Sequence, residues 1–218
     1  KYSSLLALIS SPFISSQTYA AECASGTTPS SGCTVEVSGA TYNLTGDIST
    51  SSYLGYGIKF TDTESNSLTL TGDVSTTGTN STAIYLDNTS SSTLLMNGDI
   101  SISNADSIGI YLKSDQVYYQ DPPSSSSASN NNITVNGDIS LIDLNADNNI
   151  YRTVRENILL GGTNTSNNTI TVNGDLIRSR SGTNVSIENG SNNTININGN
   201  VIQDLGGARV SIGGNENY

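Results

Sequence analysis

The sequence predicts an all-β fold, a right-handed parallel β-helix (solenoid) with coils of about 25–26 residues. The main observation is a glycine-centred segment, such as ITVNGDI, that recurs six times along the chain. A second is the alternation of apolar and polar residues around each glycine, which is the period of a β-strand. A third is composition, because Ser, Thr, Asn and Gly are abundant and residues that favour helices are scarce. The recurring glycines are Gly46, Gly72, Gly98, Gly137, Gly174 and Gly199.

The spacing of these glycines indicates stacked coils. Successive glycines lie 26, 26, 39, 37 and 25 residues apart, so three gaps define the basic coil and the two longer gaps carry insertions. One such unit cannot bury its apolar face alone, so the units must stack on one another. A hairpin meander would instead place turn signals every ~8–12 residues. The sequence therefore predicts parallel stacking, with like residues aligned.

Three apolar columns are expected to point into the solenoid, because side chains alternate between the two faces of a strand. Each column is filled in all six repeats. The glycine has the same parity, so we expect it at an inward-facing bend where the coil turns a corner. The columns are Tyr42, Leu68, Leu94, Ile133, Ile170 and Ile195; Leu44, Leu70, Met96, Val135, Val172 and Ile197; and Ile48, Val74, Ile100, Ile139, Leu176 and Val201.

A second strand is predicted upstream of most of these glycines. It contains Ile58 and Phe60 in the segment GIKF, and it returns in the segments AIYL and GIYL. Weaker copies follow at 158–160, at 185–187 and at 210–212. Residues 41–218 are therefore assigned to β-helix repeats that are incomplete at the C-terminus.

The start of the chain is typical of an exported protein. Residues 1–20 combine the positive charge of Lys1, a short apolar core and the small residue Ala20, which is the layout of a secretory signal peptide. Residues 21–40 are assigned to an N-terminal cap with a disulfide loop. Because an exported chain meets an oxidising compartment, Cys23 and Cys33 are expected to form a disulfide. The spacing excludes a CxxC redox motif.

Two outward columns follow from the same alternation. Asp47, Asp73, Asp99, Asp138 and Asp175, continued by Asn200, form one of them, with carboxylates about 4.8 Å apart. Such a column can bind Ca²⁺ or supply an acid/base pair to a sugar, but the favoured interpretation is that each Asp shapes a corner and stays solvated. The neighbouring column is expected to form a ladder of side-chain hydrogen bonds along the axis. Its members are Thr45, Thr71, Asn97, Asn136, Asn173 and Asn198.

The repeats Asn97-Gly98-Asp99-Ile100, Asn136-Gly137-Asp138-Ile139 and Asn173-Gly174-Asp175-Leu176 resemble those of bacterial autotransporter passenger domains. The resemblance covers roughly residues 40–212. It implies transport through the periplasm and the outer membrane to the cell surface or the medium, by way of a C-terminal membrane barrel that this sequence does not contain. It also implies an adhesin-like or stalk function, with a host or environmental surface, a glycan or a protein as the partner.

Composition narrows the function classes. The net charge of −11, with eight Lys and Arg, argues against binding to nucleic acid, which requires a basic footprint. Without His, the Ser-His-Asp and Cys-His nucleophile systems cannot be assembled. We therefore predict a non-catalytic protein with no cofactor, no metal site and no catalytic residue. The alternative is a carbohydrate-active β-helix enzyme, a polysaccharide lyase or hydrolase, that uses the Asp column.

One loop is a candidate contact surface. The first insertion contains Tyr118 and Tyr119, and exposed tyrosines on a long loop suit ligand contact. A flexible decoration is an equal alternative.

Overall fold

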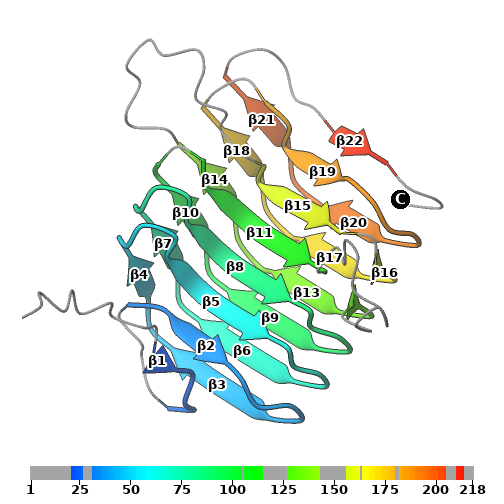
Figure 1. Ribbon diagram of the computed structural model, residues 1–218. Helices are drawn as coiled ribbons and strands as arrows, with labels where there is room; N and C mark the ends of the chain where they lie inside the picture. The colour runs from blue at the N-terminus through cyan, green and yellow to red at the C-terminus, as the bar shows by residue number, and fades with distance from the viewer. Residues whose placement is uncertain are drawn as a thin grey trace, which may run out of the picture.

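The computed structural model describes residues 21–26, 31–104, 106–114, 127–142, 156–162, 164–179, 182–204 and 210–213. All regular elements in these residues are strands, and every strand pair is parallel. Figure 1 shows the coils stacked along one axis, with β2 near one end and β22 at the other. The fold is the parallel β-helix predicted from the repeats. None of the described residues forms a helix long and apolar enough to cross a membrane.

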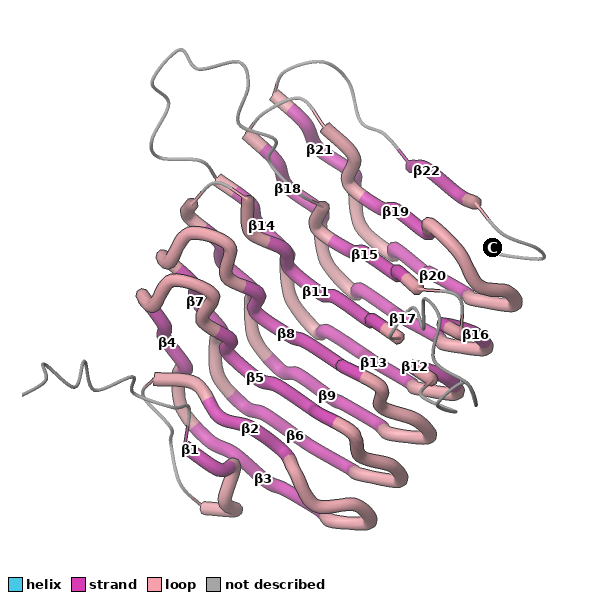
Figure 2. The backbone as a smooth tube through the Cα atoms, in the orientation of Figure 1, coloured by secondary structure: helices cyan, strands magenta, loops and turns pink. Residues whose placement is uncertain are grey.

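Each complete coil contributes one strand to each of three sheets, which Figure 2 shows as successive magenta segments of the tube, and β1 and β22 add a strand at either end of the first sheet. Sheet 1 has eight strands and contains the strand predicted upstream of the glycines. Its members are β1 (Ala21–Glu22), β2 (Cys33–Val35), β5 (Tyr56–Thr61), β8 (Thr82–Asp87), β11 (Ile108–Lys113), β15 (Ile158–Gly161), β19 (Val185–Ile187) and β22 (Val210–Ile212).

Sheets 2 and 3 lie on either side of the recurring glycines and have six strands each. Sheet 2 comprises β3 (Thr41–Thr45), β6 (Ser67–Thr71), β9 (Thr93–Asn97), β13 (Asn132–Val135), β17 (Thr169–Val172) and β20 (Thr194–Ile197). Sheet 3 comprises β4 (Ile48–Thr50), β7 (Val74–Thr76), β10 (Ile100–Ile102), β14 (Ile139–Leu141), β18 (Leu176–Arg178) and β21 (Val201–Gln203). A two-stranded sheet pairs β12 (Ala128–Ser129) with β16 (Thr165–Ser166).

The register of the sheets confirms all three predicted columns. Val135 pairs with Met96 on one side and with Val172 on the other, and the remaining members pair in the same way. In sheet 3, Ile139 pairs with Ile100 and with Leu176. The pairing is kept across the two long gaps, so the insertions leave the stacking of the coils unchanged.

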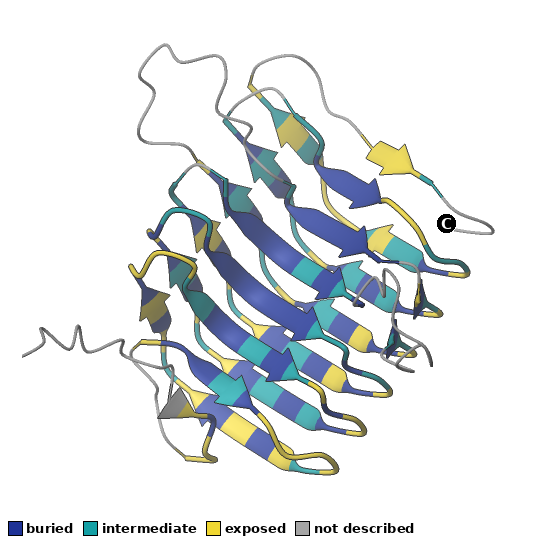
Figure 3. Cartoon of the chain, viewed as in Figure 1, coloured by how far each residue is buried: buried dark blue, intermediate teal, exposed yellow. Residues whose placement is uncertain are grey.

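The column members form one continuous core, buried along most of the rod (Figure 3). Burial decreases in the last coil, where Ile195, Ile197 and Val201 are only partly buried. The interior also holds buried polar residues, and Arg178 is the charged one among those that the structure describes, fully buried at an inward position of β18. Its Nη1 donates to the Thr183 carbonyl at 2.8 Å. Burial lowers the pKa of Arg178, and the nearby charge of Glu156 partly offsets this effect.

The recurring glycines lie at a bend between sheets 2 and 3, as predicted, but the predicted inward-facing position is wrong. Five of them, Gly46 to Gly174, are half-buried, and Gly199 is exposed. A Cβ added at Gly137 would run into the backbone carbonyl of Gly98 in the previous coil. A Cβ added at Gly72 or Gly98 would run into the backbone carbonyl of the preceding glycine of the series in the same way. Glycine is therefore required by close contact between coils along the axis rather than by space inside the solenoid.

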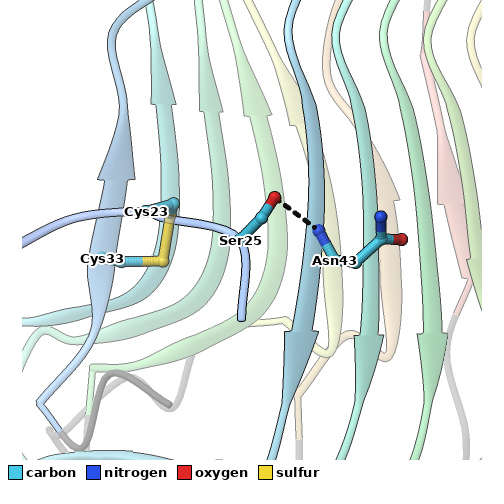
Figure 4. Close-up of a disulfide and its surroundings, with 4 residues drawn as sticks. All are labelled: Cys23, Ser25, Cys33 and Asn43. Carbon is cyan, nitrogen blue, oxygen red and sulfur yellow. Dashed lines mark hydrogen bonds between the residues drawn. A yellow bond between two sulfur atoms is a disulfide. The ribbon is translucent and has the colours of Figure 1, made fainter. Parts of the chain in front are cut away.

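The first strands form a cap joined by a disulfide between Cys23 and Cys33. Strand β2 lies within the range assigned to this cap, and it pairs with β5 so that Cys33 aligns with Ile58. The segment after Cys23 covers the edge of β3, because Gly26 N donates to the Asn43 carbonyl at 2.9 Å. Figure 4 shows the disulfide beside the bond from Asn43 N to Ser25 Oγ, which is 3.2 Å long. Both edge contacts satisfy backbone groups that would otherwise invite another strand.

Reduction of this disulfide is expected to lower the free energy of unfolding by roughly 3 kcal/mol, because the bond closes a short loop in the unfolded chain. Loss of the cap should also promote self-association through the β3 edge. Denaturant titration and light scattering, with and without dithiothreitol, measure both effects. The protein has only two cysteines, so the double variant Cys23→Ser/Cys33→Ser is a matched control that dithiothreitol should not affect. An unchanged midpoint in the reduced wild type would contradict the prediction.

Candidate functional site

The outward aspartates form a ladder that ties successive coils together. Oδ1 of each Asp accepts the backbone N–H of the residue at the same position one coil later, at 2.7–3.0 Å. The series runs from Asp47 to Asn200, and the Asn200 amide adds a second bond to Asp175 at 3.1 Å. This use of Oδ1 supports the corner-shaping interpretation. No group of three or more metal-ligating side chains occurs in the described residues.

Asparagine ladders run beside the aspartates and inside the coil. In the outward column, Nδ2 of Asn136 donates to Oδ1 of Asn97 at 2.8 Å, and Asn173 and Asn198 continue the series. This ladder was predicted, whereas a second, buried ladder was missed. In the buried ladder, Asn131 and Asn168 each donate Nδ2 to the Oδ1 of the next asparagine, at 3.0 Å, and the series ends at Asn193. The signal was present, since Asn or Ser stands six residues before five of the glycines.

These three ladders stabilise the stack. A different group of outward side chains lies on the outer face of sheet 1. The pairing of β5, β8 and β11 skips Gly57, Ala83 and Gly109. An added Cβ at Gly57 would meet the buried Val74 side chain, so Gly57 faces inward, as does the following Ile58. Because Gly57 and Ile58 both face inward, the alternation is interrupted and Tyr56 lies on the outer face. Its ring there reaches the outward residues of the neighbouring strands.

Three tyrosines from successive coils form a ladder on this face. The rings of Tyr56 and Tyr85 stack with centroids 4.9 Å apart and an interplanar angle of 12°. Tyr85 pairs in register with Tyr111, and their centroids are 5.3 Å apart at a tilt of 40°. Lys59 Nζ lies 5.1 Å from the Tyr56 centroid and 5.7 Å from that of Tyr85, within the range of a cation–π contact. The ladder ends at Leu159, which pairs with Tyr111.

A hollow of about 150 Å³ opens beside the tyrosines. The three rings, Thr82 and Ile108 form its strand side. Its other side comes from the turns that precede the strands, with one residue from each of three coils: Leu54, Asn80 and Asp106. All three have a positive φ, of 55°, 56° and 58°. This conformation is common for Asn and Asp but unusual for Leu, and half-exposed Leu54 holds an apolar side chain at the rim.

Burial raises the pKa of two tyrosines of the ladder, Tyr85 and Tyr56. It raises the pKa of Tyr85 far above the ordinary value, and the charge of Asp87 and a hydrogen bond to it add to the shift. Burial also raises the pKa of Tyr56, with a further contribution from Asp87 and an opposing one from Lys113. The Tyr85 and Tyr56 hydroxyls are uncharged hydrogen-bonding groups at neutral pH, as tyrosine ordinarily is, and the raised pKa extends this state to higher pH.

The raised pKa of Tyr85 predicts sensitivity to alkali. Unfolded Tyr85 releases its proton near pH ~10, whereas the folded residue keeps it, so above that pH the unfolded state binds fewer protons. The contribution of Tyr85 to the free energy of unfolding is then fully present below about pH 10 and decreases as the pH rises further. Thermal denaturation between about pH 8 and pH 11 measures the decline. The Tyr85→Phe variant should show a shallower decline, and an equally steep one would contradict the assignment.

Tyr118 and Tyr119, the candidate contact residues of the first insertion, lie outside the described residues. Sequence reasoning missed the tyrosine ladder, although Tyr85 and Tyr111 stand 26 residues apart, at one coil period. Tyr56 breaks that period, so only the structure places it with the other two. The fold and this surface define the class of the molecule, a disulfide-capped parallel β-helix with a tyrosine-lined hollow on its outer face. No family model, curated protein or solved structure matches the chain.

Proposed function

We propose that the chain is an exported, non-catalytic β-helix of the autotransporter passenger type, with an adhesin-like or stalk function at the cell surface or in the medium. The observation that carries the proposal is the continuous stack of coils joined at its first strands by a disulfide. Disulfides persist in oxidising compartments outside the cytoplasm, and a bond between β-helix strands suits a chain that folds there. The resemblance of the repeats to passenger domains supports the proposed secretion route through the outer membrane.

The proposed mechanism is geometric. Six coils at a spacing of about 4.8 Å make a rod roughly 29 Å long, and each coil presents side chains and loops at fixed positions on its surface. Asparagine and aspartate ladders align the coils along the axis. A rigid rod of this kind holds contact residues away from the membrane at little entropic cost, because they are ordered before any partner arrives.

Two measurements on the organism that makes the protein test the proposal. An antibody raised against the purified chain should label intact cells or detect protein in the medium, and labelling only after lysis would refute export. Sequencing of the gene beyond the codon for Tyr218 then tests the route. Further coils followed by a membrane barrel would support the passenger assignment, and a catalytic domain or a stop codon at that point would refute it.

The catalytic alternative has its own assay. Release of sugars from acidic and neutral polysaccharides is measured for the wild type and for Asp99→Asn and Asp138→Asn. Activity that disappears with either carboxylate would replace the non-catalytic proposal. The engagement of both Oδ1 atoms by backbone N–H groups favours no release in any of the three proteins.

A further inference from the structure

The hollow beside the tyrosine ladder combines aromatic rings with hydrogen-bonding groups. Tyr56, Tyr85 and Tyr111 supply the rings, and Asn80, Thr82 and Asp106 supply amide, hydroxyl and carboxylate groups around them. A sugar ring has the matching surfaces, since its C–H groups form apolar patches and its hydroxyls lie at the periphery. Small binding sites generally pair an apolar wall with a few placed polar groups. Tyrosine suits such a wall because it is rigid and amphipathic.

The local charges select among sugars. Asp106 lines the hollow, Asp87 is bonded to Tyr85, and the protein as a whole carries a charge of −11. Because Asp106 is the charged residue that lines the hollow, carboxylated or sulfated sugars are disfavoured there. Two positive charges lie nearby but do not line the hollow. Lys59 is over the Tyr56 and Tyr85 rings, and the charge of Lys113 acts on the Tyr56 hydroxyl. A neutral ligand with hydroxyl donors is therefore the best electrostatic match.

We propose that the hollow binds one ring of a neutral carbohydrate, held against Tyr56 and Tyr111 and hydrogen-bonded to the Asn80 and Asp106 side of the site. This inference rests on the proposed function and names the ligand class of the adhesin-like surface. The site is largely ordered in advance, because Tyr85 is 6% exposed and its ring is held between those of Tyr56 and Tyr111. Binding then loses little side-chain entropy.

The test is a titration of the purified chain with neutral methyl hexosides and methyl N-acetylhexosaminides, followed by NMR or calorimetry. Tyr111→Leu removes one ring, and Leu159 shows that leucine is accepted at the same position one coil later. We expect at least one neutral glycoside to bind and Tyr111→Leu to weaken it about tenfold. Tyr53→Leu is the matched control, since Tyr53 is 68% exposed and does not line the hollow.

The Asp106→Asn variant distinguishes binding of a neutral sugar from binding of a cation. Asn80 has the same backbone conformation at the same position in the previous coil, so the variant should fold. We expect it to keep most of its affinity for the neutral glycoside and to gain affinity for methyl glucuronide, which the wild type should reject. Choline chloride is the competing probe, because aromatic rings beside a carboxylate also suit quaternary ammonium groups.

Three results would overturn the inference. They are no neutral glycoside bound at millimolar concentration, an equal effect of Tyr111→Leu and Tyr53→Leu, or binding of choline alone that Asp106→Asn abolishes. Failure of this proposal and of the proposed function are distinguishable, because the titration uses purified protein whereas surface labelling uses intact cells. A chain that is displayed but binds no sugar would leave the stalk function in place.

Discussion

Val135→Asp is expected to unfold the middle of the solenoid. Val135 is fully buried in β13, between Met96 and Val172 of the neighbouring coils. A carboxylate at this position would be buried without a partner, which costs about 3–5 kcal/mol or more. Because each coil contacts only its neighbours, the damage should separate the coils on either side. Chemical denaturation and limited proteolysis measure the effect.

Thr134→Asp is the matched control for this change. Thr134 is the preceding residue of the same strand, and it is partly exposed on the opposite face of sheet 2. The same charge there should change stability by less than about 1 kcal/mol. In cells, loss of surface display in Val135→Asp but not in Thr134→Asp would link coil stacking to export. Display that is equal in both variants would count against such a link.

Gly137→Ala is expected to destabilise the protein by about 3 kcal/mol or more, a large cost for a single methyl group. The added Cβ would meet the carbonyl group of Gly98 in the coil before, and that backbone is held in the stack. The same side is occupied by Asp99, whose Oδ1 accepts the Asp138 N–H at 2.8 Å. Relief of the clash must therefore break the ladder locally. Thermal and chemical denaturation measure the loss.

Gly161→Ala tests whether this cost comes from the contact between coils. Gly161 lies in β15, and an added Cβ would meet Glu188 Oε2 at 3.4 Å and the Tyr111 ring at 3.5 Å, which are ordinary contacts with movable side chains. We expect little change in stability, or a small gain, because alanine reduces the entropy of the unfolded chain. Similar losses for the two alanine variants would show that the cost at Gly137 is not specific to coil contact.

The core of this fold could be predicted because the residues that recur at the coil period are also the residues that are buried. Ile, Val and Leu at alternate positions define an inward face, and their recurrence at one coil period defines the neighbours above and below. The predicted pairing of Ile100 with Ile139 therefore follows even though 39 residues separate them. The Asn97 to Asn198 ladder follows by the same logic, because identical amides in register bond to one another.

What could not be predicted depends on local departures from this alternation. Tyr56 reaches the outer face because the pairing skips Gly57. The skipped residues Gly57, Ala83 and Gly109 recur at the 26-residue period, but small residues at this spacing do not by themselves predict two consecutive inward positions. Arg178 occupies a column that holds Thr50, Thr76, Ile102 and Leu141 in the preceding coils. This column mixes polar and apolar residues, so its pattern alone does not predict a buried charge. Its guanidinium fits because Gly182 leaves space beside it and the Thr183 carbonyl accepts a hydrogen bond from Nη1.

The strand register is the same on both sides of the longer coils, so surface segments can differ in length without changing the framework. The pairs Val135 with Met96 and Val135 with Val172 join residues 39 and 37 positions apart, yet they match the alignment seen where the period is 26. Extra sequence at a corner is thus tolerated without realigning the rest. A chain of this design can exchange one surface segment for another of different length, in evolution or in the laboratory, while its framework remains the same.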